Sequence, residues 1–591
     1  MCTGMRWVNK VSKSVLLSLI CSLKDCAKTK DLHHGMRLHV HIQEHKLLQS
    51  NIQLGNALIN MYAKCGQVTK AESVLKELLV RDVVSWNTLI SGYVQNGQTN
   101  EAFICYELMH ADGLEPDAIT YSCMLKACGI AKEIQKGQMI HDEIARGMSL
   151  AKNIILGTAL VDMYAKCGDL TKAQRVFDEL PAHDVVSWNA LISGYVLHGN
   201  GAKVLSCYHS MQKDGLSADA VTYACVLKAC GIIGEVDTGR KIHDEVMSQR
   251  ILSTSLVVGN ALVDMYVKCG MLTQAAKVLY ELPIRDVVSW STLITGYTQQ
   301  GQTKDAFACF QQMQREGICP NAITYACILK AYGITQEVEN GERIHDEITR
   351  QRLLEKNVML GTALIDMYAK CGALTKAQKL LNELPSRDTV SWSALIGGYA
   401  QQGRAEEAFN CFQQMLIEGI TPDVISWNAL IVGFAQKGQV EDALSCFQWM
   451  QCEGFPPNAV TFTCVLNACG HSGLVNQGQT YFENIARNDG IMPSLEHHTC
   501  MVDMFVRAGQ FDKAMTVFTK LASYDHLPIC SSLLNACRNW GHVQLGRLIF
   551  ERIIQLNKHD AAAYTCMAEI YADAGMQEDA KKIKFIKAKI F

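Results

Sequence analysis

Three triplets that place a glutamate two residues after a histidine come closest to a catalytic pattern. They are His141-Asp142-Glu143, His243-Asp244-Glu245 and His345-Asp346-Glu347. A zinc-dependent nucleobase deaminase takes a metal ligand and a proton shuttle from His-x-Glu, and two more ligands from Cys-x-x-Cys. No two of the 25 cysteines stand three residues apart, so the second half of such a site is missing. Because the triplets recur every 102 residues, in register with His39, we interpret the histidines as structural.

Other catalytic patterns are missing as well. The chain has no Gly-x-x-x-x-Gly-Lys-Ser/Thr loop for phosphates, and its Ser, His and Asp residues recur with the repeat instead of gathering in one group. The sequence therefore predicts a protein that is not an enzyme, with no catalytic residue, cofactor, metal or small-molecule substrate.

A long internal repeat positions all of these residues. The stretch RDVVSWNTLISGY returns three times almost unchanged, and its aspartates lie 102 residues apart, at Asp82, Asp184, Asp286 and Asp388. Each block divides into units of 35, 36 and 31 residues, of which the first set is 83–117, 118–153 and 154–184. In such an array each unit buries its apolar face against its neighbours.

Each unit is predicted to form two antiparallel helices. In 83–117 the apolar residues recur at helical spacing, Asn96-Gly97 ends the first helix, and Pro116 lies beyond the end of the second. The prediction is therefore an all-α fold, a right-handed α-solenoid superhelix of antiparallel helical hairpins.

The array is predicted to occupy 16–526 in about 15 units. Their bounds are 16–51, 52–82, 83–117, 118–153, 154–184, 185–219, 220–255, 256–286, 287–321, 322–357, 358–388, 389–423, 424–458, 459–494 and 495–526. The order breaks once, where the Trp-bearing unit 389–423 is followed by a second Trp-bearing unit. Residues 527–591 are expected to add two degenerate helical hairpins, whose lysine-rich end suits a terminal cap.

The composition favours packed helices and leaves the partner open. Of the 591 residues 49% are hydrophobic and 10 are proline, and the formal net charge is −3. A neutral total argues weakly against nucleic acid, since phosphate-binding proteins usually carry a basic patch. Eighteen cysteines fall in four repeat registers. We therefore predict that they are small buried side chains in a reducing compartment.

The amino terminus imitates a targeting segment. Basic residues precede the apolar run Val15–Leu23, but this run aligns with repeat helix residues 102 positions later and is shorter than the ~20 residues needed to span a membrane. Only residues 1–15 remain as a possible transit remnant.

The repeated strings resemble the pentatricopeptide repeat (PPR) family. DVVSWNALISGY at 184–195 and ALIDMYAKCG at 363–372 resemble its subfamily of alternating P, L and S repeats, and SLLNACR at 532–538 resembles the E-type extension of that subfamily. The resemblance covers about 16–591. It implies binding of single-stranded organellar RNA with the 5′ end near the amino terminus, most often for cytidine-to-uridine RNA editing.

In this family the fifth residue of a repeat, assisted by the last, recognises one base. Such a residue must be an exposed polar group on the inner helix that meets a Watson–Crick edge. The implied uridine readers are Asn56/Asp82, Asn87/Asp117, Asn189/Asp219 and Asn260/Asp286. The implied purine readers are Thr158/Asp184, Thr362/Asp388 and Ser393/Asp423 for guanine and Ser291/Asn321 for adenine, while Asn428/Asn458 suits a pyrimidine. The alternative for these Asn and Asp residues is helix capping and turn chemistry.

The 36-residue units depart from this pattern. Their fifth residues Ile20, Ala224 and Ala326 cannot hydrogen-bond a base, so we expect them to space the other units. The predicted RNA sequence is roughly 5′-U-U-n-G-U-n-U-A-n-G-G-Y-3′, on the one-base-per-repeat model.

Two further sets are implied. Second-position residues resemble the apolar wedges that sandwich bases, with plain core as the alternative: Val84, Val186, Val288, Val390 and Ile425. Four lysines near the end of a first helix are weaker candidates for phosphate contacts, with simple stabilisation of the helix C-terminus as the alternative: Lys64, Lys166, Lys268 and Lys370.

The predicted partner is thus RNA, not a membrane. No Asp-Tyr-Trp-ending deaminase domain is recognised, so editing would need a deaminase in trans, and 527–591 is the expected docking region for editing factors. The resemblance implies a plant mitochondrion, with the chloroplast as the alternative, and a role in editing or other mRNA processing. A peptide-binding scaffold of the tetratricopeptide type is the competing prediction, because its 34-residue signature overlaps this one.

Overall fold

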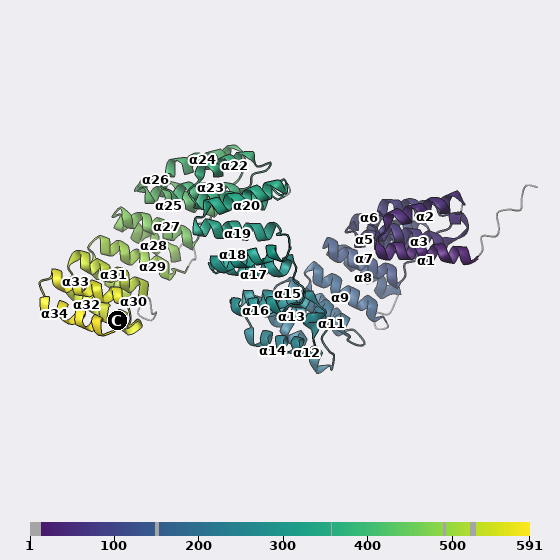
Figure 1. Cartoon of the computed structure of the whole chain (residues 1–591), viewed down its shortest axis with the longest axis horizontal. Helices are drawn as coiled ribbons and strands as arrows, with labels where there is room; N and C mark the ends of the chain where they lie inside the picture. Colours follow the sequence, from purple (N-terminus) through teal and green to yellow (C-terminus); the bar gives the residue numbers. More distant parts are fainter. Residues whose placement is uncertain are drawn as a thin grey trace, which may run out of the picture. The chain divides into compact units, whose positions relative to one another are not determined.

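The computed structural model describes residues 13–45, 47–147, 153–355, 357–487, 492–520 and 527–590. Within these ranges the only regular elements are helices (Figure 1). The chain divides into two compact units, Met1–Gly296 and Tyr297–Phe591. Residues 1–12, most of the predicted transit remnant, lie outside the described part.

The first unit is a run of helical hairpins. Its helices are α1 (Lys13–Thr29), α2 (Leu32–Glu44), α3 (Ile52–Lys64), α4 (Val68–Glu77), α5 (Val83–Gln95), α6 (Thr99–Ala111), α7 (Ala118–Ala131), α8 (Ile134–Gly147), α9 (Ile154–Cys167), α10 (Leu170–Asp178), α11 (Val185–Leu197), α12 (Gly201–Lys213), α13 (Ala220–Ile233), α14 (Val236–Ser248), α15 (Leu256–Lys268) and α16 (Leu272–Glu281). Short 3₁₀ turns, η1 (Leu47–Ser50) and η3 (Ile251–Ser253), follow α2 and α14, and α17 (Val287–Gln299) spans the division.

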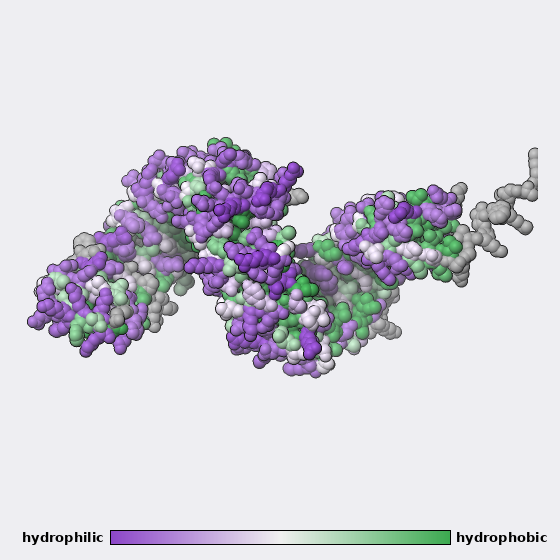
Figure 2. Space-filling model, in the orientation of Figure 1, coloured by the Kyte–Doolittle hydropathy of each residue, from purple (hydrophilic) through white to green (hydrophobic). Residues whose placement is uncertain are grey.

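The second unit continues the same pattern. It holds α18 (Thr303–Arg315), α19 (Ala322–Thr335), α20 (Val338–Arg350), α21 (Val358–Lys370), α22 (Leu374–Glu383), α23 (Thr389–Gln401), α24 (Ala405–Ile417), α25 (Val424–Gln436), α26 (Val440–Cys452), α27 (Ala459–His471), α28 (Val475–Arg487), α29 (Leu495–Arg507), α30 (Phe511–Lys520), α31 (Leu527–Trp540), α32 (Val543–Leu556), α33 (Ala561–Asp573) and α34 (Gln577–Ile590). The surface over α31–α34 is largely hydrophilic on the face shown in Figure 2.

The odd-numbered helices are the first helices of the repeats and pack in sequence. In the first unit α3 packs on α1, α5 on α3 and so on to α15, and in the second unit the same order runs from α19 to α33. First helices begin at Val83, Ala118, Ile154 and Val185, which reproduces the 35-, 36- and 31-residue units. The predicted all-α solenoid of helical hairpins is confirmed, while the hand of its superhelix stays a prediction.

Capping boxes explain where the first helices begin. Asp184 accepts a hydrogen bond of 2.8 Å from the Ser187 backbone N–H, and the Ser187 hydroxyl faces back to the Asp184 backbone. This exchange satisfies two backbone donors that a helix start would otherwise leave free. One residue later Trp188 is buried in the core, so the repeated Asp-x-x-Ser-Trp string joins the cap to the core.

The core is linear and contains many of the cysteines. Two cysteine registers are buried as predicted, namely Cys105, Cys207, Cys309, Cys411 and Cys446, and Cys26, Cys128, Cys230 and Cys469. The prediction is wrong for Cys21, which is exposed, and right for Cys464, which is buried. It is only partly right for the cysteines of intermediate exposure, namely Cys123, Cys225 and Cys327, and Cys65, Cys167, Cys269 and Cys371. None of the described helices is long and apolar enough to cross a membrane.

Candidate nucleic-acid interface

The first helices carry the predicted base-reading residues, and the fold brings most fifth residues to the last residue of the same repeat. Five pairs are joined by a side-chain hydrogen bond, of 3.4 Å for Asn56–Asp82, 2.9 Å for Asn87–Asp117, 3.0 Å for Asn189–Asp219, 3.2 Å for Asn260–Asp286 and 3.2 Å for Ser393–Asp423. Residues 26 or 30 positions apart thus form one polar group, which we call a reading pair.

Asn87 shows how such a pair is built. Its amide nitrogen donates to Asp117, and its amide oxygen accepts a 2.6 Å hydrogen bond from the Thr120 hydroxyl of the next repeat. The side chain is only 6% exposed, and Asn189, Ser291 and Ser393 are buried to a similar extent. The expectation of an exposed fifth residue is therefore wrong in these repeats. Hydrogen bonds to Asp117 and Thr120, at the start of the next first helix, hold the Asn87 amide in place. One N–H and one lone pair of the amide remain unused.

The last residue of the repeat is also the helix cap that the alternative interpretation proposed. Asp117 accepts hydrogen bonds from the backbone N–H groups of Ile119 and Thr120, at 3.0 and 2.8 Å, while it holds Asn87. Burial disfavours its charged form, but these hydrogen bonds outweigh that effect and keep its pKa below the ordinary value. Asp82 and Asp219 have lowered pKa values for the same reason. One carboxylate therefore both caps the next helix and holds the Asn87 amide.

In three of the other four predicted pairs this hydrogen bond is missing, and in the fourth the two residues lie in different units. Thr158 and Asn428 each have a buried side-chain oxygen with no partner among the described residues, and Thr362 donates to the Val358 carbonyl at 3.3 Å. Their predicted partners are Asp184, Asn458 and Asp388, which serve as helix caps. Ser291 and Asn321 belong to different units, so the structure does not define their distance.

The predicted wedges lie on the surface. Val84 is 57% exposed, and Val186, Val288, Val390 and Ile425 are at least half exposed, so the plain-core alternative is wrong for all five. Single exposed apolar side chains are common, but a regular row of them along one set of helices leaves apolar surface unburied at a fixed register. They are placed as apolar walls beside the reading pairs.

A cavity of about 270 Å³ shows the arrangement around one pair. Val84 and Ile119 line it together with Asn87, Asp117 and Lys64. A planar base between two apolar side chains would meet the polar pair with its edge. Apolar walls bind any base, whereas the polar pair can distinguish donors from acceptors.

Ile119 belongs to a set that the sequence analysis missed. The second residue is also apolar and about half exposed or more in most 36- and 31-residue units: Ile119, Ile155, Val221, Val257, Ile323, Met359 and Val460. The signal was an apolar residue, branched in six of these seven units, at the second position of the unit. The row of exposed second-position residues therefore continues through the 36- and 31-residue units, including the 36-residue units for which no pair was predicted.

Polar fifth residues in two 36-residue units were also missed, namely Ser122 and Thr463. The hydroxyl oxygen of Ser122 is buried without a partner among the described residues, and the side chain lines a cavity of about 290 Å³. Thr463 donates to the Ala459 carbonyl at 3.0 Å. Aligning every 36-residue unit at its second residue would have shown both.

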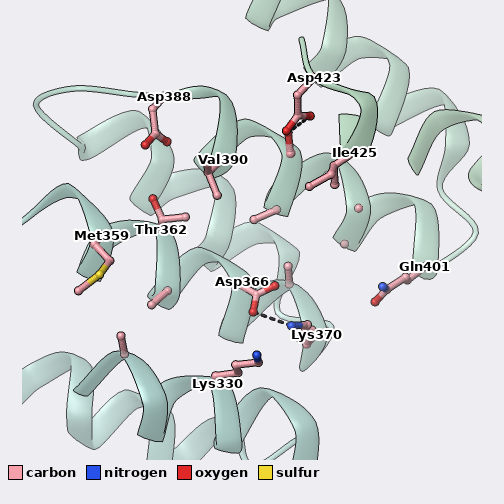
Figure 3. A pocket seen from close by; sticks show the side chains of 17 residues that line it. Lys330, Met359, Thr362, Asp366, Lys370, Asp388, Val390, Gln401, Asp423 and Ile425 are labelled. Atoms are coloured by element: carbon pink, nitrogen blue, oxygen red, sulfur yellow. Dashed lines mark hydrogen bonds and ion pairs between the residues drawn. The ribbon is translucent and has the colours of Figure 1, made fainter. Parts of the chain in front are cut away.

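A larger cavity, with a volume of about 630 Å³, lies in the second unit (Figure 3). Met359, Val390 and Ile425 stand along it as three successive second-position residues, with Thr362 and Asp388 between the first two and Asp423 beside Ile425. It therefore spans two neighbouring predicted base positions. At one of them Ser393 donates to Asp423 as Asn87 does to Asp117, whereas at the other Thr362 donates to the Val358 carbonyl and not to Asp388.

The predicted phosphate lysines differ among themselves. Lys166, Lys268 and Lys370 are in ion pairs of 2.6–2.7 Å with an aspartate one turn earlier in the same helix, Asp162, Asp264 and Asp366. This pairing neutralises them and was not anticipated. Lys64 has Asn60 in the place of the aspartate, is exposed, and lines the cavity beside Asn87. Of the four, Lys64 is the best placed for a phosphate.

The histidine triplets connect neighbouring repeats. His141 Nδ1 lies 2.8 Å from the hydroxyl of Tyr164 in the following repeat, while Glu143 accepts from Tyr106 of the preceding one at 2.9 Å. His39, His243 and His345 contact Tyr62, Tyr266 and Tyr368 in the same way. The structural interpretation is confirmed. Within the described residues no three His, Cys, Asp or Glu side chains gather closely enough to hold a metal ion.

Comparisons with known proteins match this geometry to one family. A model described as "PPR repeat family" matches 81–129, 183–231, 285–333, 387–426 and 422–471, and one described as "PPR repeat" matches 56–83, 158–185, 260–287, 362–388 and 496–525.

The chain is similar to two Arabidopsis thaliana proteins among others. The pentatricopeptide repeat-containing protein At2g03380, mitochondrial, is 31% identical over 95% of this chain and 76% of its own length. The pentatricopeptide repeat-containing protein At1g15510, chloroplastic, is 30% identical over 98% of this chain and 62% of its own length.

Solved structures of the maize pentatricopeptide repeat protein PPR10 share the fold. One crystal structure aligns with a TM-score of 0.54 and 19% identity over 97% of this chain and 90% of that one. A second, in complex with an 18-nt psaJ RNA element, aligns with a TM-score of 0.52 and 17% identity over 98% and 92%.

Proposed function

Because the chain belongs to the pentatricopeptide repeat family, we propose that it binds single-stranded RNA, with one base at each reading pair. We propose that the nine predicted pairs, from Asn56/Asp82 to Asn428/Asn458, recognise the bases, including the four that no hydrogen bond is shown to join. Val84, Val186, Val288, Val390 and Ile425 separate the bases, and the second-position residues of the other units extend the row.

One observation carries the proposal. At Asn87 and Asp117 a polar pair with unused hydrogen-bonding capacity lies beside two branched side chains that are more than half exposed, Val84 and Ile119. The cavity in Figure 3 repeats the arrangement once, at Ser393 and Asp423 beside Val390 and Ile425. A peptide-binding groove does not need polar pairs that recur at a fixed register beside apolar side chains, whereas a strand of bases can use them.

We propose the RNA sequence from the residue types of the pairs. Asparagine with aspartate favours uridine, threonine or serine with aspartate favours guanine, serine with asparagine favours adenine, and Asn428/Asn458 favours a pyrimidine. We keep the predicted sequence 5′-U-U-n-G-U-n-U-A-n-G-G-Y-3′, with the 5′ end at the amino-terminal repeats.

The cellular role is proposed from the family. Relatives are named as mitochondrial and chloroplastic, and we propose an organelle, the mitochondrion first. The P, L and S order of the repeats supports a role in editing or other processing of a transcript. We propose that the E-type region 527–591 docks the editing deaminase or its associated factors. Deleting 527–591 should abolish capture of editing factors, and unchanged capture would refute this role.

The test of RNA binding compares oligonucleotides at ~0.15 M salt. The cognate sequence should bind at least about tenfold more tightly than a scrambled one, which is about 1.4 kcal/mol. Replacing Asn87 and Asn189 by Ser should remove this margin or move the preference at both positions toward guanine. Fluorescence anisotropy measures each affinity.

A matched double variant controls for the substitution itself. Asn100→Ser with Asn200→Ser makes the same chemical change at two exposed asparagines near the starts of the second helices α6 and α12, away from the reading pairs. It should keep both affinity and preference. Failure of the wild-type chain to bind either RNA would refute the proposal and favour a protein partner.

A further inference from the structure

A second row of lysines follows the first helices of the 36-residue repeats. The ninth residue of four of these units is lysine, at Lys24, Lys126, Lys228 and Lys330, and all four are exposed. None of them has an ion-pair or hydrogen-bond partner among the described residues. The whole chain has a net charge of −3, yet these first helices carry unpaired lysines at one fixed register. Such regular placement suggests that the lysines bind an anionic group.

These lysines are not counterions of the neighbouring repeat. The ninth residue of the next unit is an acid, Asp162 after Lys126, but Lys166 of its own helix already pairs with it at 2.6 Å. The stem of Lys166 packs on Gly129, where an added Cβ would lie 3.2 Å from its Cδ. Two of the 102-residue blocks that follow repeat this pairing, at Asp264–Lys268 and Asp366–Lys370. The acids are satisfied, and the ninth-position lysines remain free.

Two of the free lysines line cavities of the base-binding surface. Lys330 points from α19 into the cavity of Figure 3, beside the Asp366–Lys370 ion pair. Asp366 and Lys370 neutralise each other, so Lys330 gives this group of three side chains a net charge of plus one. Lys126 lines the cavity between Ile119 and Ile155 in the first unit. Each ammonium group therefore lies near the position of a base without being part of a reading pair.

The same units are poor in base recognition. Three of the four fifth residues, Ile20, Ala224 and Ala326, offer no hydrogen bond, and the fourth, Ser122, has one buried hydroxyl, yet the wedges Val221 and Ile323 are about half exposed. Such a unit can stack a base but cannot identify it. A lysine four residues after the fifth position lies one helical turn away on the same face.

We propose that the 36-residue repeats bind the RNA backbone, with Lys24, Lys126, Lys228 and Lys330 each contacting a phosphate. This inference rests on the proposed RNA binding. Units that were expected only to space the others would thus bind phosphates electrostatically. The reading pairs place carboxylates near the strand, for example Asp388 and Asp423 in Figure 3. One free lysine in every 102 residues offsets that charge and holds the strand in register without sequence preference.

The test compares two triple variants of the full chain with equal loss of charge. The first replaces Lys126, Lys228 and Lys330 by Gln, and the control replaces Lys203, Lys213 and Lys304, exposed lysines of the second helices α12 and α18. Affinities for the cognate and the scrambled RNA are measured between about 0.05 and 0.2 M salt. Circular dichroism confirms that both variants keep the wild-type melting temperature.

The first variant should lose affinity for both RNAs by the same factor, about tenfold or more, and keep their ratio. The slope of log affinity against log salt should fall by about 2, since each phosphate contact on a single strand contributes about 0.7. A loss no larger than in the control, with wild-type binding intact, would overturn this inference alone. A collapse of the cognate-to-scrambled ratio would also overturn it, because the lysines would then recognise bases. Absence of wild-type binding would instead refute the proposed function on which it rests.

Discussion

The last residue of a reading pair combines helix capping with the role in base recognition that we propose for it. Asp117 begins α7 as its cap, orients the amide of Asn87, and faces the cavity between two wedges. Asn321 and Asn458 cap α19 and α27 with an amide oxygen at 2.9 Å from the Thr324 and Thr461 N–H groups. The helix cap needs only a hydrogen-bond acceptor. The orientation of Asn87 and the proposed choice of base depend on the remaining donors and acceptors of the side chain. Aspartate and asparagine can therefore exchange without loss of the fold.

Replacing Asp117 by Asn should separate the two roles. We expect α7 to keep its stability, because the amide oxygen still accepts from Thr120. Asp117→Ala should destabilise the helix start by about 1 kcal/mol and leave the Asn87 amide without its acceptor. Hydrogen exchange of α7 measures the stability, and anisotropy with single-base variants measures the preference. Equal destabilisation by Asn and Ala would show that the cap depends on the negative charge.

The first helices of neighbouring repeats approach closely where a glycine faces an alanine. An added Cβ at Gly92, Gly194 or Gly398 would lie 2.7, 2.3 or 2.5 Å from the Cβ of Ala63, Ala165 or Ala369 in the preceding first helix. Contacts below 3.0 Å cannot be accommodated without moving a helix. The glycine in the repeated Ser-Gly-Tyr or Gly-Gly-Tyr string therefore sets the spacing between repeats, and with it the distance between successive wedges.

Adjacent glycines in α23 provide a matched comparison at this scale. Gly398→Ala should destabilise the array by about 1–3 kcal/mol, because the methyl group also meets the Ala369 Cα at 3.2 Å. Gly397→Ala has no atom within 4 Å of the new Cβ and should stabilise the helix by about 0.5–1 kcal/mol. Thermal unfolding followed by circular dichroism ranks the two. Equal effects would mean that helix propensity, and not the close approach, governs this position.

Four histidine–tyrosine pairs link successive repeats along the molecule. Burial lowers the pKa of His39, His141, His243 and His345 below the ordinary value near 6.5. For His141 the charges of Asp142 and Glu179 oppose this shift without cancelling it, while Lys172 adds to it. Each histidine is therefore neutral in the fold under conditions where the unfolded chain takes up a proton. Four such links make the array as a whole sensitive to acid.

The direction of the pH dependence follows from these lowered pKa values. Stability from the four histidines is complete above about pH 6.5 and falls as the pH decreases toward the folded-state pKa. We expect a lower melting temperature at about pH 5.5 than at about pH 7.5. A variant with all four replaced by Gln, which can still hydrogen-bond the tyrosine hydroxyl, should lose most of this difference. The same decrease in wild type and variant would assign the effect to other groups.

Much of the fold is determined locally and could be predicted. Asp-x-x-Ser-Trp predicts a cap followed by a buried aromatic residue, and the 102-residue period predicts the helix starts at Val83, Ala118 and Ile154. These are properties of neighbouring residues in the chain, so a sequence contains them. The reading pairs were also predictable, but only from the family resemblance, because their members lie 26 or 30 positions apart.

By itself, then, the sequence determined the repeat, its helices and the residue types at each register. Only the tertiary structure decided what those residues contact. In the fold Asn87 is buried and accepts a hydrogen bond from the next repeat, whereas Val84 is exposed. Lys166 forms an ion pair with Asp162, and Lys126 and Lys330 have no ion-pair partner among the described residues. The physical reason is that burial and charge pairing depend on the distance between successive first helices, which packing at residues such as Gly194 and Ala165 sets.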